Sequence, residues 1–119
     1  MAQDRPTAAE LLAAIADFLR EEATPALDRA EPRIGFQMRV AANSLAILER
    51  EARLGAAADA REQARLSALL GHDGTLEDLN RELARQLRTG ERDERDAELM
   101  AHLDATIADK IAIANPRWR

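Results

Sequence analysis

Residues 39–51 read RVAANSLAILERE, and this stretch decides the fold class. Its apolar residues follow helical spacing, with Val40 and Ile47 on one side and Leu45 and Leu48 on neighbouring sides. A helix that is apolar on more than one side is either central in a helical bundle or in contact with a partner protein. The stretch therefore predicts an all-α protein built around this helix.

Two polar residues interrupt the same stretch. Arg39 and Asn43 lie one turn apart, on a stripe that continues to Arg50. Buried polar groups need hydrogen-bond partners, so these side chains either brace the inside of a bundle or belong to a docking face. For the first alternative, Asp109 on the last predicted helix is one expected mate of Arg39.

Working outward from the central helix, local signals predict where it and the first helix begin and end. Thr7 and Glu10 have the spacing of a capping box, which starts the first helix. Pro25 perturbs or ends that helix. The central helix is expected over about residues 33–54, with Gly55 just past its last turn.

Three further helices are predicted in the second half of the chain. Each has a cap or a breaker at its ends, and the residues that mark these ends are Asp59, Glu62, Gly71, Thr75, Gly90, Asn115 and Pro116. No alternation typical of strands appears anywhere in the sequence. The predicted fold is all-α, a single compact bundle of about five helices in one domain over residues 1–119.

Composition excludes several classes of protein. The net charge is −5, with basic residues spread among acidic ones, which argues against nucleic-acid binding. No apolar run is long enough to cross a membrane, and there is no cysteine for disulfides or thiolate metal sites. The N-terminus MAQDRPTAAE lacks the pattern of a signal peptide, so a cytoplasmic location is expected.

Catalytic and metal-binding motifs are also missing from the sequence. Glu98 and His102 are spaced four apart, but the Glu-x-x-His pairs of carboxylate-bridged metal bundles do not occur. No glycine-rich phosphate loop or nucleophile arrangement is present either. The sequence predicts no catalytic residue, no metal and no cofactor, and acid pairs such as Glu21 and Glu22 are expected on solvated helix surfaces.

The C-terminal segment DKIAIANPRWR ends beyond the last helix with the only tryptophan of the chain. Trp118 is flanked by Arg117 and Arg119, and tryptophan and arginine are common in interface hot spots. This tail either folds back on its own bundle or docks on another chain.

Three segments together resemble a small bacterial family of helical proteins of unknown function. They are DRPTAAELLAAIADFL (4–19), RVAANSLAILERE (39–51) and DATIADKIAIANPRW (104–118). Proteins of this family are typically encoded beside an aminoglycoside-phosphotransferase-like kinase and an acyl-CoA dehydrogenase. The resemblance extends over essentially the whole chain, although residues 60–70 and the ERDERD segment match only in general character.

The family is similar to the accessory subunit of the hydroxyacyl-CoA kinase of levulinate-type catabolism. The resemblance implies a non-catalytic protein that binds and supports a phosphotransferase-fold kinase acting on a 4-hydroxyacyl-CoA. It transfers no catalytic residue. The matching positions are candidates for partner binding or for an internal polar brace: Arg39, Asn43, Glu49, Asp109, Asn115, Arg117 and Trp118.

Other functions stay open from the sequence alone. One is a stand-alone binding module for an acyl-CoA-like ligand, held between helices by arginine side chains. Another is a self-associating structural protein, for which a homodimer is the simplest form. A third is a small enzyme that uses a carboxylate pair in a dry cleft.

Overall fold

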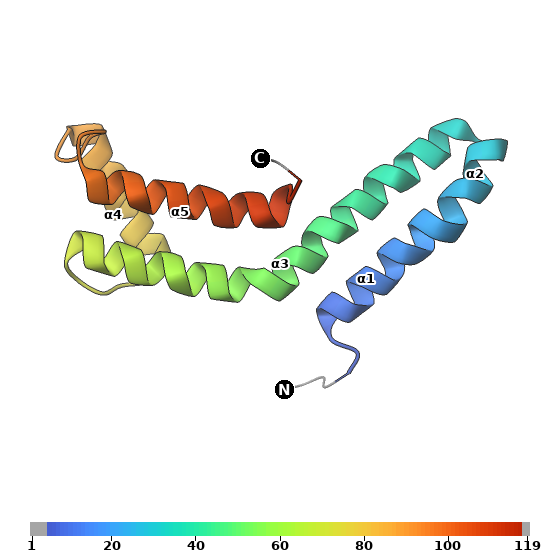
Figure 1. Ribbon diagram of the computed structural model, residues 1–119, viewed down its shortest axis with the longest axis horizontal. Helices are drawn as coiled ribbons and strands as arrows, with labels where there is room; N and C mark the ends of the chain where they lie inside the picture. The colour runs from blue at the N-terminus through green and yellow to red at the C-terminus, as the bar shows by residue number, and fades with distance from the viewer. Residues whose placement is uncertain (1–4, 118–119) are drawn as a thin grey trace. The chain divides into compact units, whose positions relative to one another are not determined.

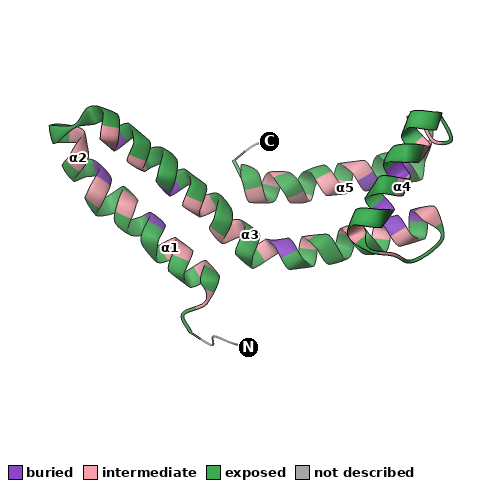
Figure 2. Cartoon of the chain, turned by 180° about the vertical axis from the view of Figure 1, so that it is seen from behind, coloured by how far each residue is buried: buried purple, intermediate pink, exposed green. Residues whose placement is uncertain are grey.

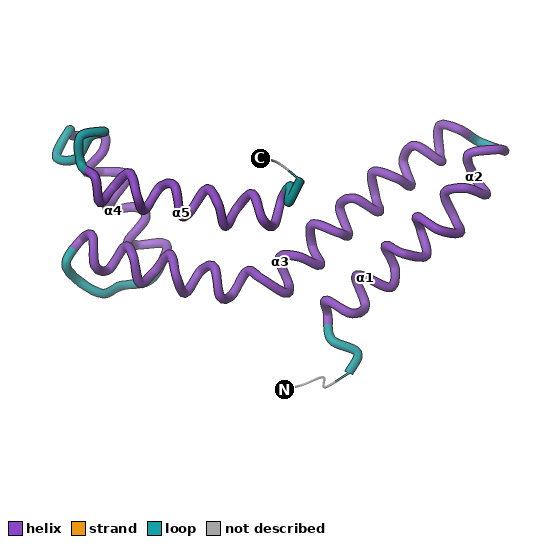
Figure 3. The backbone as a smooth tube through the Cα atoms, viewed as in Figure 1, coloured by secondary structure: helices purple, strands orange, loops and turns teal. Residues whose placement is uncertain are grey.

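The computed structural model describes residues 5–117, and every element within that range is helical (Figures 1 and 3). The elements in chain order are α1 (Ala8–Phe18), the π-helical turn η1 (Leu19–Ala23), α2 (Thr24–Ala30), α3 (Pro32–Leu70), α4 (Leu76–Thr89) and α5 (Ala97–Ala114). The all-α prediction is confirmed. Because α1, η1 and α2 follow one another without a break, the described residues form four continuous helical stretches rather than five.

Pro25 does not end the first helix, because a wider turn accommodates its ring. The five residues before Thr24 form η1, and the Thr24 N–H donates to the C=O of Leu19, five residues back. A proline has no N–H and clashes with the preceding turn of an α-helix, and the wider π-helical turn ahead of Pro25 relieves this clash. The helix then continues to Ala30.

Gly55 does not end the central helix either, and this sequence prediction was wrong. The expected second and third helices are one helix, α3, which runs through Gly55 and the supposed capping residues Asp59 and Glu62. Glycine inside a helix costs about 1 kcal/mol relative to alanine, which the neighbouring helix formers in LGAAADA can outweigh.

The other predicted boundaries are confirmed. Thr7 and Glu10 make a reciprocal capping box at the start of α1, and the Thr75 hydroxyl accepts from the Asp78 N–H at the start of α4. Gly90 ends α4 at a φ of 78°, a left-handed conformation that glycine adopts without strain.

The described residues divide into two compact units. The first contains residues 5–54 with Ile113–Asn115, and the second contains Gly55–Ala112 with residues 116–117. The prediction of one domain over 1–119 stays a prediction.

The first unit is a helical hairpin, in which α1 and the first part of α3 lie side by side and antiparallel (Figure 1). Side-chain bonds from Arg20 to Asn43 and from Arg39 to Asp28 join the two arms. The buried residues of this hairpin are small, namely Ala16, Thr24, Gly35 and Ala42. Figure 2 shows only isolated buried positions along the two arms, between stretches that are half-buried or exposed. The hairpin therefore lacks a core of large side chains.

Gly35 lets α2 approach α3 closely. A Cβ at this position would lie 2.0 Å from Oδ1 and 3.1 Å from the backbone Cα of Asp28. An exposed helical glycine normally gains stability on replacement by alanine. We expect Gly35→Ala to weaken the hairpin instead, by about 1 kcal/mol, because Asp28 must shift and its pairing with Arg39 is disturbed. Faster hydrogen exchange in α2 and in the first turns of α3 would show the effect, whereas unchanged or slower exchange would contradict it.

The second unit contains the main hydrophobic core. The last part of α3, α4 and α5 bury five leucines against one another: Leu66, Leu69, Leu79, Leu83 and Leu99. Ion pairs and hydrogen bonds, such as Arg61 to Asp109 and Arg65 to Thr106, tie α3 to α5 along their antiparallel path. The large apolar side chains that the sequence offers for burial are thus used mainly here.

Candidate functional site

Large apolar side chains lie exposed along one side of α3 in the hairpin. Phe36, Val40 and Ile47 are 62%, 49% and 39% exposed, and Asn43 lies on the same stripe between Val40 and Ile47. We call these four residues the α3 face. Scattered exposed apolar residues are ordinary, but a contiguous stripe is typical of an interaction site.

Asn43 and the neighbouring Arg39 are held by side chains from the other arm of the hairpin. The Arg20 guanidinium donates to Asn43 Oδ1 at 3.4 Å, and Arg39 donates to Asp28 Oδ2 at 2.5 Å. The expected pairing of Arg39 with Asp109 does not occur. Because these contacts are solvent-exposed, each contributes less than about 1 kcal/mol, and their main effect is to fix the polar groups beside the α3 face.

The end of α5 lies next to the α3 face within the first unit. Arg50, one turn beyond Ile47, donates through Nε to the backbone oxygen of Ile113 at 2.6 Å. That carbonyl is in the last turn of α5, where backbone acceptors have no partner inside the helix. The bond brings Asn115, which is exposed, toward this end of the face. Arg117 is exposed, and Trp118 lies outside the described residues.

The two acidic candidates have partners of their own. Glu49 is half-buried and accepts from Arg53 one turn later at 3.0 Å. Asp109 accepts from Arg61 at 3.0 Å in the second unit. The structure therefore brings Arg39 and Asn43 together in the hairpin, joins the end of α5 to Arg50 further along α3, and places Asp109 in a separate contact.

A shallow groove of about 570 Å³ lies at the open end of the hairpin. Its floor is apolar and includes Ala8, Ala13 and Ala52. Arg5 and Arg53 line it as well, but each is already paired with its own glutamate, Glu10 and Glu49. An anionic ligand in this groove would have to compete with those carboxylates.

His102 belongs to a polar cluster inside the second unit that sequence reasoning missed. Its side chain is buried, and its Nδ1 accepts from Arg65 Nε at 3.3 Å. Arg65 also donates to the Thr106 hydroxyl at 3.1 Å. Burial, followed by the charge of Arg65, lowers the pKa of His102, and Glu62 opposes this shift. Within residues 5–117, no group of three or more His, Asp or Glu side chains is arranged to hold a metal ion.

The lowered pKa of His102 predicts acid sensitivity. In the unfolded chain the pKa of His102 is about 6.5, and in the folded chain it is lower. Below about pH 6.5 the unfolded chain therefore binds a proton at His102 more readily than the folded chain does. The free energy of unfolding is highest above about pH 6.5 and decreases as the pH falls toward the folded pKa. We expect the free energy of unfolding of the second unit to decrease from about pH 7 to pH 5. His102→Gln, which keeps an acceptor for Arg65, should flatten this slope in urea titrations.

His72 provides the matched control because its pKa shifts in the opposite direction. A hydrogen bond to the Asp73 carbonyl, together with Glu82, raises the pKa of the exposed His72 imidazole. The protonated His72 stabilises the folded chain below about pH 6.5, and this stabilisation is lost as the pH rises through the folded pKa of His72. His72→Gln should therefore make the acid loss steeper. Equal slopes in both variants and the wild type would contradict the assignment.

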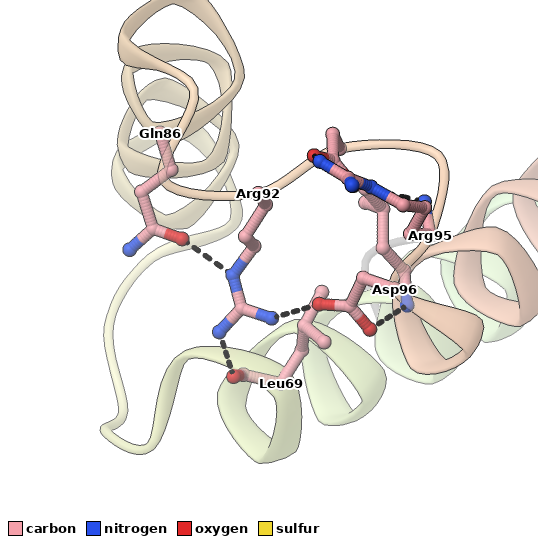
Figure 4. A network of polar contacts seen from close by, with 7 residues as sticks. Leu69, Gln86, Arg92, Arg95 and Asp96 are labelled. Carbon is pink, nitrogen blue, oxygen red and sulfur yellow. Dashed lines mark hydrogen bonds and ion pairs between the residues drawn. The ribbon is translucent and has the colours of Figure 1, made fainter.

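Arg92 joins three helices at one end of the second unit (Figure 4). Its guanidinium donates to the Gln86 side chain of α4, to the backbone oxygen of Leu69 in α3 and to the Asp96 carboxylate ahead of α5. Asp96 also accepts from the Leu99 N–H, and this bond followed by Arg92 holds the pKa of Asp96 below its ordinary value. The arrangement is structural, since each of the three guanidinium nitrogens of Arg92 donates to a protein acceptor in Figure 4.

Comparison with known proteins gives one match. A family model described as a domain of unknown function, DUF6285, matches residues 25–118. The chain therefore belongs to the DUF6285 family. No curated protein and no solved structure matches it. None of the helices in the described part of the chain is both long and apolar enough to cross a membrane.

Proposed function

We propose that this DUF6285 protein is a non-catalytic accessory protein that binds and supports a phosphotransferase-fold kinase in the cytoplasm. The observation that carries the proposal is the α3 face, where Phe36, Val40 and Ile47 remain exposed beside the fixed polar groups Arg39 and Asn43. Interfaces typically combine a core of aromatic and aliphatic side chains with a hydrogen-bonding rim that includes arginine.

The kind of partner is inferred from the family resemblance of residues 4–19, 39–51 and 104–118. That resemblance favours an aminoglycoside-phosphotransferase-like kinase whose substrate is a hydroxyacyl-CoA. In the proposed complex the kinase supplies the nucleotide site and the chemistry. The accessory protein supplies the α3 face, with Asn115 extending the contact at the Arg50 end. Arg117 and Trp118 are further partner-binding candidates that the resemblance implies.

Co-expression with an aminoglycoside-phosphotransferase-like kinase of the kind that the resemblance implies tests the proposal. The two proteins should co-elute in size-exclusion chromatography at micromolar concentration, and ATP-dependent phosphorylation of a 4-hydroxyacyl-CoA should need both. Val40→Glu should weaken the complex at least about tenfold, because it places a charge in the centre of the contact. Trp118→Ala should weaken it as well if the tail docks.

Ala64→Glu offers a matched control, because it places the same charge on an exposed part of α3 in the second unit, away from this face. It should leave the complex intact. Separate elution of the wild-type proteins, or equal binding by Val40→Glu and Ala64→Glu, would contradict docking through the α3 face.

A further inference from the structure

A second apolar surface lies on the hairpin, on the opposite side from the α3 face. Leu11, Ile15 and Phe18 follow one stripe of α1 and are 42%, 48% and 54% exposed. Arg20, in η1 just beyond α1, lies roughly 160° around the helix axis from the middle of this stripe, and its side chain bonds to Asn43 on the α3 face. The stripe therefore points away from the α3 face.

Leu48 of α3 extends this second surface. Gly35 and Ala42 are buried and mark the side of α3 that contacts α1. By helical geometry, Leu48 and the α3 face lie on opposite flanks of that contact, and Leu48 is 53% exposed. We call Leu11, Ile15, Phe18 and Leu48 the α1 face. Its half-buried neighbours are uncharged as well: Leu12, Leu19, Ile34 and Leu45.

We propose that the α1 face is the interface of a homodimer, in which two hairpins pack as a four-helix bundle around a two-fold axis near Ile15. The hairpin alone buries only small side chains, and two such hairpins would enclose a shared core of leucine, isoleucine and phenylalanine. The inference is independent of the proposed kinase partner, which uses the other side of the hairpin.

The exposed apolar area supplies about two thirds of what the smallest stable dimer interface requires. The four side chains of the α1 face expose on the order of 400 Å² in each copy. Two copies thus supply about 800 Å² from these residues alone, and the surrounding Leu12, Leu19, Ile34 and Leu45 add to it. Stable specific interfaces bury about 1,200–2,000 Å² in total.

The order of side chains along α1 fits a second copy in antiparallel orientation. With the two-fold axis near Ile15, Phe18 of one copy lies opposite Leu11 of the other. The same pairing brings Glu22, at one end of the stripe, toward Arg5 of the other copy, whose side chain is 79% exposed and contacts Glu10 of its own chain.

Sedimentation velocity of the full chain from about 1 to 100 μM tests the dimer. The wild type should sediment as a dimer, and Ile15→Glu should raise the dissociation constant at least about 100-fold. Val40→Glu, on the α3 face, is the matched control and should remain dimeric. A wild type that stays monomeric at 100 μM, or a dimer that is disrupted by Val40→Glu and not by Ile15→Glu, would overturn the proposal.

Cysteine cross-linking tests the dimer independently, in case circular dichroism shows that the Ile15→Glu variant does not fold. The natural sequence has no cysteine, so a single introduced thiol can pair only with its copy. Ile15→Cys, next to the two-fold axis, should form an interchain disulfide at least about tenfold faster than Val40→Cys. Equal rates would overturn the proposed geometry.

Kinase binding gives a further outcome. If the wild type is monomeric and Ile15→Glu abolishes its binding to the kinase, the α1 face contacts the kinase and the dimer is excluded.

Discussion

Leu79→Ala is expected to destabilise the second unit by about 3 kcal/mol, one of the largest effects of a single apolar truncation among the described residues. Leu79 is only 1% exposed and lies in the cluster of α3, α4 and α5 together with Leu66 and Leu99, which are equally enclosed. Truncation removes the burial of three methyl or methine groups and leaves a cavity. Its lining cannot collapse freely, because three different helices hold it.

Urea unfolding followed by circular dichroism, together with hydrogen exchange in α4 and α5, measures this loss. Leu87→Ala is the matched control, since it makes the same substitution two turns further along α4 at a side chain that is 41% exposed. The control should cost less than about 1 kcal/mol. If both variants lost equal stability, the core would not lie where the structure places it.

The helix boundaries that the sequence predicted correctly depend on neighbouring residues. The Thr7 and Glu10 box, the Thr75 cap and the left-handed Gly90 all act within one helical turn, so their effect can be read from local spacing. The same reasoning failed at Gly55. Whether a helix ends or continues at Gly55 depends on the helix-forming residues on both sides of it, along the whole of α3, rather than on the glycine alone.

Side-chain partners far apart in sequence could not be predicted in the same way. Arg39 was expected to reach Asp109 and instead pairs with Asp28, because the hairpin brings α2 beside α3. Asp28 itself carried no signal in the sequence, since an acid on a helix surface is ordinary. The exposure of Phe36 could not be predicted either, because periodicity shows which residues share a helix face but not whether another helix covers that face.

Arg92 shows the same limit at a residue with a large expected effect. In sequence it is one charge in the segment ERDERDAE, whereas in the structure it contacts acceptors on α3 and α4 and at Asp96, the residue just before α5. We expect Arg92→Met to destabilise the second unit by about 2 kcal/mol. The variant keeps most of the apolar stem, but it leaves the Leu69 carbonyl, at the C-terminal end of α3, and the Gln86 side chain without their donor.

Two further variants, compared by urea unfolding, distinguish the effect of the Arg92 hydrogen bonds on stability from the effect of its charge. Arg95→Met, three residues later, removes an arginine whose side chain is 87% exposed and bonds only to nearby Asp93, so it should change stability by less than about 0.5 kcal/mol. Arg92→Lys keeps the charge near Asp96, but an ammonium on a flexible stem cannot reproduce the planar fork that meets three acceptors. It should recover at most half of the lost stability. Full recovery by lysine would mean that Arg92 acts as a charge and that its bonds to Gln86 and Leu69 contribute nothing measurable.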